Sequence, residues 1–496
     1  MPECIVKVAG IKKYFGGVKA LDGVDLEIRK GEVHCLAGEN GCGKSTLINI
    51  ISGFYSPDAG TVEIDGVEYT NISPKAAISN GIQVIYQDLS VFPNLTVMEN
   101  LALNMEVAEG RKFYSKKRFR RIAEEALAKI GFQIDLDEYV ENLTVGDKQM
   151  IAICRALLNN AKLIIMDEPT TAITKKEIKS LFKVIRQLQS NNIAVLFVSH
   201  KLDEVFEIAD SYTIFRNGKN VATGKTSEMT QDKFTYYMTG REISEAPFAY
   251  HGGPDAETVL EVKNLSLKDG FEDISFAVKK GEILGITGLL GSGRTELVQA
   301  IFGYHCADSG EILVEGEPVK IHSIKDSIKL GIGYVPPDRL TYALFFNQPI
   351  CDNITIEKWK ELRKNGLMNK KKISEETEKW VEELSIALST IHAPVGSLSG
   401  GNQQKCMLAR WLALNLKVLI LNGPTVGVDI GAKFDIYKLI RKLAQTGLTV
   451  IIISDDLPEI ISNCNRVLVM RQGRVVSELP TENLTEATLL DLSIEA

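Results

Sequence analysis

The sequence lacks the features that mark a membrane-spanning or secreted chain. No apolar run approaches the roughly 20 residues that a helix needs to cross a bilayer, and the longest runs, such as IAVLFV at Ile193–Val198, have the length of a strand. The first residues, MPECIVKVAG, contain no basic region followed by an apolar stretch, so we expect no secretory signal. If the protein works at a membrane, another chain supplies the part that crosses it.

Basic charge and paired cysteines are also scarce. The formal net charge of −7 argues against nucleic acid as the main partner, because phosphate binding usually requires a basic excess. The eight cysteines are scattered and form no C-x-x-C pair, which argues against zinc and redox motifs and favours reducing, cytosolic surroundings. With 45% hydrophobic, 24% charged and 7% aromatic residues, the composition is that of a globular protein.

What the sequence does contain is a repeat of half its length. VDLEIRKGEVHCLAGENGCGKST around Gly31 matches ISFAVKKGEILGITGLLGSGRTE around Gly281. These two glycines lie 250 residues apart, whereas the later pair Leu143 and Leu398 lies 255 residues apart. Five residues are therefore inserted between them in the second copy.

Each copy predicts an α/β domain. Short β-branched strands, such as LIIMD and TVIIIS, alternate with amphipathic stretches, which is typical of a mainly parallel sheet and here of a P-loop core. Helix-rich stretches at about 94–158 and 353–414 predict an inserted helical subdomain in each copy. The glycine-bearing segment HGGPDAE is the natural linker. We predict domains at 1–245 and 258–496, joined by a linker at 246–257.

The strongest single motif is GENGCGKS, which fits G-x-x-x-x-G-K-[ST] and precedes the apolar helix start TLINIISG. Glycines turn backbone N–H groups toward phosphates, Lys44 supplies positive charge, and the Ser45 hydroxyl can bind Mg²⁺. The predicted nucleotide-binding residues of this loop are Gly38, Glu39, Asn40, Gly41, Cys42, Gly43, Lys44, Ser45 and Thr46. Cys42 is expected to fill space; a thiol pKa lowered by the helix start would instead make activity sensitive to alkylation.

The segment LIIMDEP, Leu163–Pro169, is an apolar strand that ends in two carboxylates. The C-terminal end of such a strand faces the ligand crevice, so Asp167 is predicted to hold Mg²⁺ and Glu168 to polarise water. A carboxylate pair that caps a turn before Pro169 is the alternative for an isolated D-E-P. The P-loop upstream favours the catalytic interpretation.

Two further segments make the resemblance specific. LTVGDKQ and LSGGNQQK resemble the signature motif of the ABC family, and each precedes a D-E-P or its remnant. In that family's pattern, Gln87 corresponds to the Q-loop glutamine, His200 to the switch histidine and Phe15 to the aromatic residue that stacks on adenine. The fused two-copy layout is similar to that of monosaccharide importers of the ribose, galactose and xylose type.

The resemblance implies that the copies face head to tail, with each ATP between one P-loop and the other copy's signature. Site one combines the first P-loop with the second signature, and every expected group is present. The implied catalytic residues are Glu168, His200 and Gln87, the implied Mg²⁺ ligands are Ser45, Gln87 and Asp167, and the implied nucleotide contacts outside the P-loop are Phe15, Ser399, Gly400 and Gly401. The implied cofactors are ATP and Mg²⁺.

Site two collects the departures from the family's pattern. They are Arg294 for the P-loop lysine, Pro337 for the Q-loop glutamine, Asn422 and Gly423 for the D-E pair, Asp455 for the histidine, and Val145 and Asp147 in the partner signature. Asn422 is a poorer Mg²⁺ ligand than a carboxylate and Gly423 offers no base, a loss that typically costs about 10² to 10⁴ in rate. We expect negligible hydrolysis at site two.

Several alternatives stay open at this point. Asp455 and Pro337 are either regulatory or ordinary surface and turn residues, and Phe15 is either an adenine contact or part of the core. The basic runs at Arg111–Arg121 and Lys358–Lys372 are either solvated helix faces or surfaces attracted to anionic lipid headgroups.

The resemblance implies ATP hydrolysis that powers import of a sugar or similar small polar solute. The implied partners are integral membrane permease subunits and, indirectly, an external solute-binding protein, with no nucleic acid and no need for a homodimer. The expected location is cytoplasmic, peripheral on the inner face of the cell membrane. There are two rival hypotheses: a ribosome-associated twin-ATPase translation factor, and an ATP-gated regulator without transport. Translation factors of that class resemble one another in keeping both ATP sites competent and in having a long charged linker between the domains.

Overall fold

The structure is a computed structural model that describes residues 3–87, 90–108, 115–170, 173–242, 256–364 and 367–494. The chain divides into two compact units, Met1–Ile243 and Ser244–Ala496. Residues 246–255 of the predicted linker lie outside the described residues, so the finer domain boundaries stay a prediction.

The first unit is built on a six-stranded sheet with the strand order β10-β9-β3-β8-β7-β6. Five of these strands run parallel, and β10 joins the edge antiparallel to β9. The inner strands are continuous apolar runs because both faces of a parallel sheet are covered. The strands are β3 Val33–Gly38, β6 Ile82–Ile85, β7 Leu163–Asp167, β8 Ala194–Val198, β9 Ser211–Arg216 and β10 Lys219–Lys225.

A four-stranded antiparallel sheet with the order β2-β1-β4-β5 packs beside helix α1. Its strands alternate buried and exposed residues, the pattern of a sheet with one solvated face. They are β1 Cys4–Phe15, β2 Val18–Arg29, β4 Ala59–Ile64 and β5 Val67–Tyr69.

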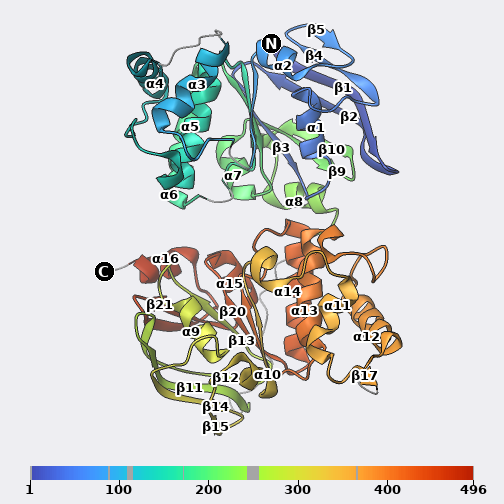
Figure 1. Cartoon of the computed structure of the whole chain (residues 1–496), viewed down its shortest axis with the longest axis vertical. Coiled ribbons are helices and arrows are strands. Elements are labelled where there is room, and N and C mark those ends of the chain that lie inside the picture. The colour runs from blue at the N-terminus through green and yellow to red at the C-terminus, as the bar shows by residue number, and fades with distance from the viewer. Residues whose placement is uncertain are drawn as a thin grey trace. The chain divides into compact units, whose positions relative to one another are not determined.

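Among the helices of the first unit, α3, α4 and α5 lie together at one side of the unit (Figure 1). These three occupy the stretch that the sequence predicts as a helical insert, and their buried faces share a core through residues such as Phe119 and Met150. The helices are α1 Lys44–Ile51, α2 Pro74–Ser79, α3 Val97–Ala108, α4 Lys116–Ile130, α5 Val145–Leu158, α6 Lys175–Ser190, α7 Leu202–Ile208 and α8 Gln231–Thr239.

The second unit repeats this plan, with sheets in the order β16-β19-β20-β13-β21-β22 and β12-β11-β14-β15. Its strands are β11 Thr258–Leu267, β12 Phe271–Lys279, β13 Ile283–Thr287, β14 Ser309–Val314, β15 Glu317–Val319, β16 Ile332–Val335, β19 Val418–Asn422, β20 Thr449–Ile453, β21 Arg466–Arg471 and β22 Arg474–Pro480, with a small hairpin of β17 Arg363–Lys364 and β18 Leu367–Met368.

The helical insert of the second unit is formed by α11, α12 and α13 (Figure 1). The helices are α9 Arg294–Ile301, α10 Ile324–Lys329, α11 Ile350–Thr355, α12 Lys370–Glu383, α13 Gly400–Leu412, α14 Ile430–Gln445, α15 Leu457–Asn463 and α16 Glu486–Ile494. The predicted fold, two tandem α/β units that each carry a helical insert, is confirmed.

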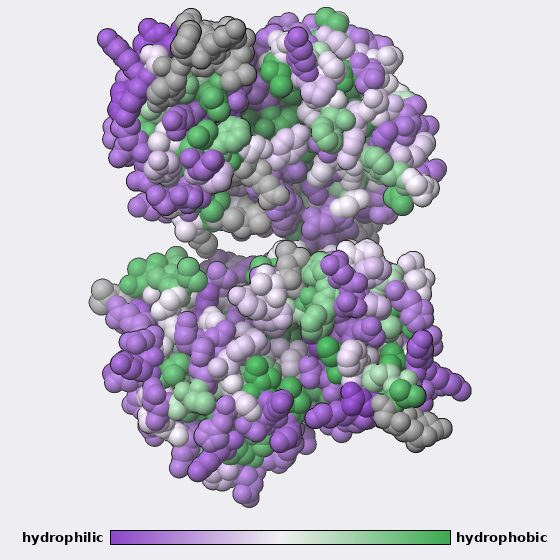
Figure 2. Space-filling view, in the orientation of Figure 1, coloured by the Kyte–Doolittle hydropathy of each residue, from purple (hydrophilic) through white to green (hydrophobic). Residues whose placement is uncertain are grey.

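In the described part of the chain, no helix is both long enough and apolar enough to cross a membrane. On the face shown in Figure 2, hydrophobic residues form small groups among hydrophilic ones in both units.

Candidate functional site

The candidate site of the first unit lies at one edge of its parallel sheet. The strands β3, β8, β7 and β6 are neighbours in this order and run in the same direction. Gly38 ends β3, His200 follows β8, Asp167 ends β7 and Gln87 follows β6. Because the carboxyl ends of parallel strands form the usual ligand crevice, residues far apart in the sequence converge there.

The P-loop connects β3 to α1 in a conformation that requires glycine at two positions. Gly38 has φ 150° and Gly43 has φ 109°, and a Cβ at either residue would lie within about 2.5 Å of a backbone carbonyl oxygen. Lys44 is buried, and its Nζ donates to the carbonyls of Gly38 at 2.7 Å and Glu39 at 2.9 Å. The loop thus holds a buried cation beside the start of α1, which suits phosphate binding.

The end of β7 places a carboxylate next to this loop. Ser45, the second residue of α1, lies close enough to Asp167 to influence its carboxylate. Burial and the charge of Glu168 raise the pKa of Asp167, while Lys44 and Ser45 act in the opposite direction. A hydroxyl paired with a carboxylate is the oxygen donor set that Mg²⁺ prefers, so the residues present fit this ion.

Glu168 and His200 form a pair at the same edge. His200 Nδ1 donates to Glu168 Oε1 at 3.0 Å, and both side chains are mostly shielded from solvent. Glu168 has φ 47°, an uncommon value for a non-glycine residue, and its backbone N–H donates to the carbonyl of Val198 in the neighbouring strand. The left-handed turn at Glu168 therefore follows directly after the last residue of β7, and its carboxylate meets His200.

Two further predicted residues, Phe15 and Gln87, are exposed. Phe15 ends β1, is 41% exposed, and presents a ring that contacts the edge of Tyr55 at a centroid distance of 5.4 Å. Lys13 Nζ lies 5.4 Å from the centroid of the same ring. Gln87 is exposed, two residues beyond the end of β6. The exposure of Phe15 contrasts with its buried counterpart in the second unit, Leu265.

The expected lowering of the Cys42 pKa is wrong. Burial raises the pKa of this thiol, with Lys44 and backbone hydrogen bonds acting in the opposite direction. The side chain is 5% exposed and packs against Gly38, so the helix start does not compensate for the loss of solvent. Cys42 therefore fills space in the loop.

Glu204 is a candidate functional residue that sequence reasoning missed. Its buried carboxylate accepts hydrogen bonds from Thr170 at 2.6 Å and from Ser199 at 3.1 Å. These contacts tie the segment after Glu168 to the segment that carries His200. Comparison of the two copies could have revealed it, because Glu459 accepts equivalent bonds from Thr425 and Ser454 in the second unit.

The second P-loop has the backbone conformation of the first, but its charged groups differ. Gly288 and Gly293 have φ 155° and 91°, and Arg294 donates to the carbonyl of Gly288 at 2.7 Å, as Lys44 does to Gly38. Arg294 also lies 4.0 Å from Asp455, whose side chain is 79% exposed. Burial lowers the pKa of Arg294 and the charge of Asp455 opposes this effect, so Asp455 contributes a counter-charge to the loop.

The remaining groups of the second unit do not fit a Mg²⁺ site with a base. Asn422 ends β19, and its side-chain N–H donates to the hydroxyl of Tyr334 at 3.2 Å within the core. Gly423 has φ 59° and donates to the carbonyl of Ile453, which repeats the backbone of Glu168 without its carboxylate. The turn is preserved while the chemistry that it carries in the first unit is lost.

The two signature segments differ at the start of their helices. Thr144 caps α5 by accepting a hydrogen bond from the backbone of Asp147, and its hydroxyl lies 3.0 Å from Glu177. Ser399 precedes α13, which begins with Gly400 and Gly401. The tight contact of Gly401 with Ala432 leaves no room for a Cβ there. The roles of Ser399, Gly400 and Gly401 toward a nucleotide stay a prediction.

Comparison with known proteins gives the same division into two copies. The family model described as ABC transporter matches residues 21–171 and again 271–426. Among solved structures, the chain is similar to the ADP conformation of MJ1267, an ATP-binding cassette of an ABC transporter, at 30% identity and a TM-score of 0.44, covering 48% of this chain and 99% of that chain.

Curated relatives match the whole chain. The ribose import ATP-binding protein RbsA of Bacillus licheniformis is 40% identical over 98% of this chain and 99% of its own length. RbsA of Bacillus subtilis is 38% identical with the same coverage. A putative ribose/galactose/methyl galactoside import ATP-binding protein of Geobacillus kaustophilus is 40% identical over 99% of this chain and 98% of its own length.

Proposed function

The chain belongs to the ABC transporter family of ATPases, and on this premise we propose that it hydrolyses ATP to drive import of a sugar through a separate membrane permease. The observation that carries the proposal is the convergence of P-loop, carboxylates and histidine at the ends of three adjacent strands, β3, β8 and β7. Relatives matched along nearly their whole length are import ATP-binding proteins for ribose. The translation-factor and regulator hypotheses are not favoured.

Each group of the first unit has a distinct part in the reaction. Lys44 and the backbone N–H groups of the loop bind the phosphates, and Phe15 offers a ring face to adenine. Glu168 accepts a proton from the attacking water, and His200 orients the Glu168 carboxylate and faces the terminal phosphate. Ser45, Gln87 and Asp167 would hold Mg²⁺, which neutralises phosphate charge when it is bound with the nucleotide.

The proposal assigns hydrolysis to the first P-loop alone. Arg294 keeps the second P-loop cationic, but Gly423 offers no base and the Asn422 amide bonds to Tyr334. Ser399, Gly400 and Gly401 are proposed to act on the ATP held by the first P-loop. Since one chain carries both halves, no homodimer is needed.

The membrane partners are proposed to dock near Gln87 and Pro337, at the grooves beside β6 and β16. The partners are integral permease subunits at the inner face of the membrane, and these subunits receive the sugar from an external binding protein. Such an arrangement couples a change in the nucleotide site to the permease through the segments that follow β6 and β16.

Transport by the reconstituted assembly tests the function. The chain and its permease are placed in vesicles with ATP, and uptake of labelled ribose is compared with uptake of a panel of other sugars in the presence of the binding protein. We expect ATP-dependent uptake of one sugar and none with Glu168→Gln. ATPase activity without uptake of any sugar, together with cosedimentation with ribosomes, would support the translation-factor hypothesis instead.

A further inference from the structure

The start of helix α5, in the first signature segment, is covered by a carboxylate from the neighbouring helix α6. The Oε1 atom of Glu177, in the first turn of α6, lies 3.0 Å from the hydroxyl of Thr144, the residue that precedes α5. A Cβ placed on Gly146, the second residue of α5, would lie only 2.5 Å from the same oxygen. The Glu177 carboxylate therefore rests directly against the first turn of α5.

Several contacts hold this carboxylate in place and in its charged form. Its Oε2 accepts hydrogen bonds from the backbone N–H and the hydroxyl of Thr174, each at 2.7 Å. These bonds from Thr174 hold the pKa of Glu177 below its ordinary value; burial acts against them, and Thr144 and the Gly146 backbone act with them. Because a helix start carries unpaired N–H groups and a partial positive charge, it stabilises a carboxylate as it would a phosphate.

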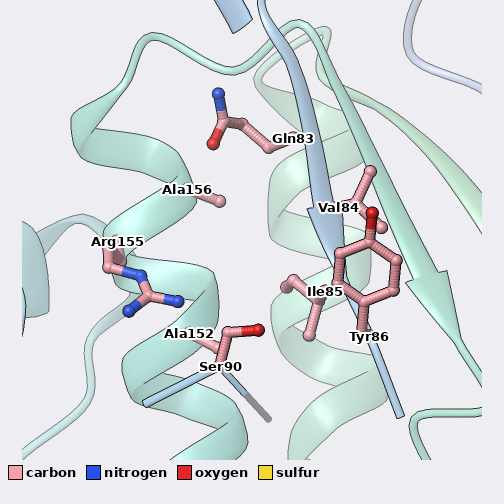
Figure 3. A pocket seen from close by; sticks show the side chains of 8 residues that line it. All are labelled: Gln83, Val84, Ile85, Tyr86, Ser90, Ala152, Arg155 and Ala156. Atoms are coloured by element: carbon pink, nitrogen blue, oxygen red, sulfur yellow. The ribbon is translucent and has the colours of Figure 1, made fainter. Parts of the chain in front are cut away.

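The rest of α5 is fixed by the core of the first unit. Figure 3 shows Ala156, in the last turn of the helix, directed toward β6. Met150, Ile151 and Ile153 are buried in the core that the helix shares with the parallel sheet. A shift of the helix start away from Glu177 would disturb this close packing, so the fold favours the contact between the carboxylate and the helix start.

The second unit has an alanine at the position of this glutamate. Ala432 lies 255 residues after Glu177, which is the spacing of the two signature segments. The Cβ of Ala432 lies 2.6 Å from where a Cβ on Gly401 would stand, just as the Glu177 carboxylate lies against Gly146. The two side chains thus occupy the same place beside their signature helices, and only the first carries a charge.

Asp147 adds a second carboxylate to the start of α5. Its Oδ2 lies 2.9 Å from the Thr144 hydroxyl oxygen, and its backbone N–H donates to the same oxygen at 3.1 Å. The matching residue of α13 is Asn402, whose side-chain N–H donates to the Ser399 hydroxyl at 2.9 Å. Both carboxylates at the start of α5 are therefore replaced by neutral side chains at the start of α13.

We infer that Glu177 is a specificity-determining residue that closes the first signature to the terminal phosphate of a nucleoside triphosphate. The inference rests on the proposed function, in which a signature helix acts on the nucleotide held by the other P-loop. A phosphate that approached α5 would meet the charges of Glu177 and Asp147, and like charges brought together oppose binding. Hydrolysis at the second P-loop is then prevented twice, because Gly423 offers no base and the signature is already filled.

Transfer of the carboxylate to the second unit tests the inference. Ala432→Glu in the full chain places an anion beside Gly401, where the proposed function puts the phosphate of the ATP that is hydrolysed. Ala432→Gln introduces a side chain of the same size without the charge and is the matched control. We expect kcat/KM for ATP to be about tenfold or more lower for Ala432→Glu than for Ala432→Gln, the effect of a like-charge contact. Equal values for the two chains overturn the inference.

Removal of the carboxylate from the first unit is the converse test. Lys44→Ala removes the cation of the first P-loop, so that labelled ATP and ADP report on the second P-loop in equilibrium dialysis of the full chain. Adding Glu177→Ala should tighten ATP binding by about tenfold or more and leave ADP binding unchanged, because only ATP carries the terminal phosphate. Glu124→Ala, which removes the same charge at an exposed residue of α4, should change neither affinity.

The outcomes distinguish this inference from the proposed function. No gain in ATP affinity on removal of Glu177, or an equal gain for ATP and ADP, overturns the inference and leaves ATP-driven transport intact. A purely structural role of Glu177 would lower the unfolding temperature of Glu177→Ala without separating ATP from ADP. A wild-type chain that neither binds nor hydrolyses ATP overturns the proposed function, and the inference with it.

Discussion

At the scale of single residues, the two copies carry different chemistry on the same backbone. Glu168 and Gly423 share a left-handed turn and a hydrogen bond to the neighbouring strand, and only the former supplies a carboxylate. The glycine is strain-free where the glutamate is not, because φ near 50° is uncommon for residues with a Cβ. The first unit therefore keeps a conformational cost that a catalytic position explains.

Exchange of the base tests this difference. Glu168→Gln keeps the size and the hydrogen bond to His200 but removes the proton acceptor, so steady-state ATP turnover should fall by about 10² to 10⁴. Arg294→Ala in the second P-loop should leave most of the turnover. Loss of turnover in Arg294→Ala, with the melting temperature unchanged, would contradict the assignment of hydrolysis to the first P-loop.

Thiol reactivity tests the environment of Cys42. Because burial raises the pKa of its thiol, the reactive thiolate is scarce at neutral pH and the sulfur is shielded. We expect iodoacetamide to modify the exposed Cys306 well before Cys42, as followed by mass spectrometry of peptides over time. Modification of Cys42 in the folded chain as fast as that of Cys306 would restore the hypothesis of an activated thiol.

At the scale of elements, one carboxylate links two helices of the first unit. Glu177 completes a capping box with Thr174 at the start of α6, and its Oε1 also lies 3.0 Å from the hydroxyl of Thr144 at the start of α5. The hydrogen bonds from Thr174 hold the pKa of Glu177 below its ordinary value, with burial acting against them. The ionised form is thus bound more strongly in the folded state.

Removal of this carboxylate should lower stability in a pH-dependent way. Glu177→Ala should cost about 1 kcal/mol, the typical value of a lost cap, which lowers the unfolding temperature of a unit of this size by roughly 2–4 °C. A lowered pKa contributes stability above the ordinary pKa of the group that is lost as pH falls. Calorimetry should therefore show the deficit of Glu177→Ala shrinking in acid. Glu124→Ala, on an exposed face of α4, should show no deficit at either pH.

At the scale of the whole molecule, the two units retain different motifs of the family. The first has the intact nucleotide-binding edge and the second has the intact signature, LSGGN. This complementary loss is what the family resemblance predicts for a chain that hydrolyses ATP once per cycle. Under the proposed function, the second unit supplies the signature needed for hydrolysis and offers a second docking surface to the permease.

Paired substitutions in the two signatures test this division. Gly400→Arg should abolish ATP hydrolysis, because its bulk and charge replace the backbone surface that serves the ATP of the first P-loop. Val145→Arg, at the matching and exposed position of the first signature, should leave most of the activity. Counting trapped nucleotide should give one cleaved ATP per chain; two cleaved, or equal effects of the two substitutions, would contradict the division.

The sequence by itself determined the repeat, the fold class, the P-loop and the carboxylate pair. These features depend on local spacing, on strand-length apolar runs and on the glycines that a phosphate-binding loop requires. Motif comparison also located the departures of the second copy, including Asn422, Gly423 and Asp455. Such patterns can be recognised in the sequence because each is formed by residues that lie close together along the chain.

Only the tertiary structure decided which groups are paired and which are not. Burial reversed the expected pKa shift of Cys42, and the buried carboxylate of Glu204 became visible through its two donors. The pKa of a side chain and the satisfaction of its hydrogen bonds depend on solvent exclusion and on partners distant in sequence. Those quantities are fixed only when the strands and helices pack.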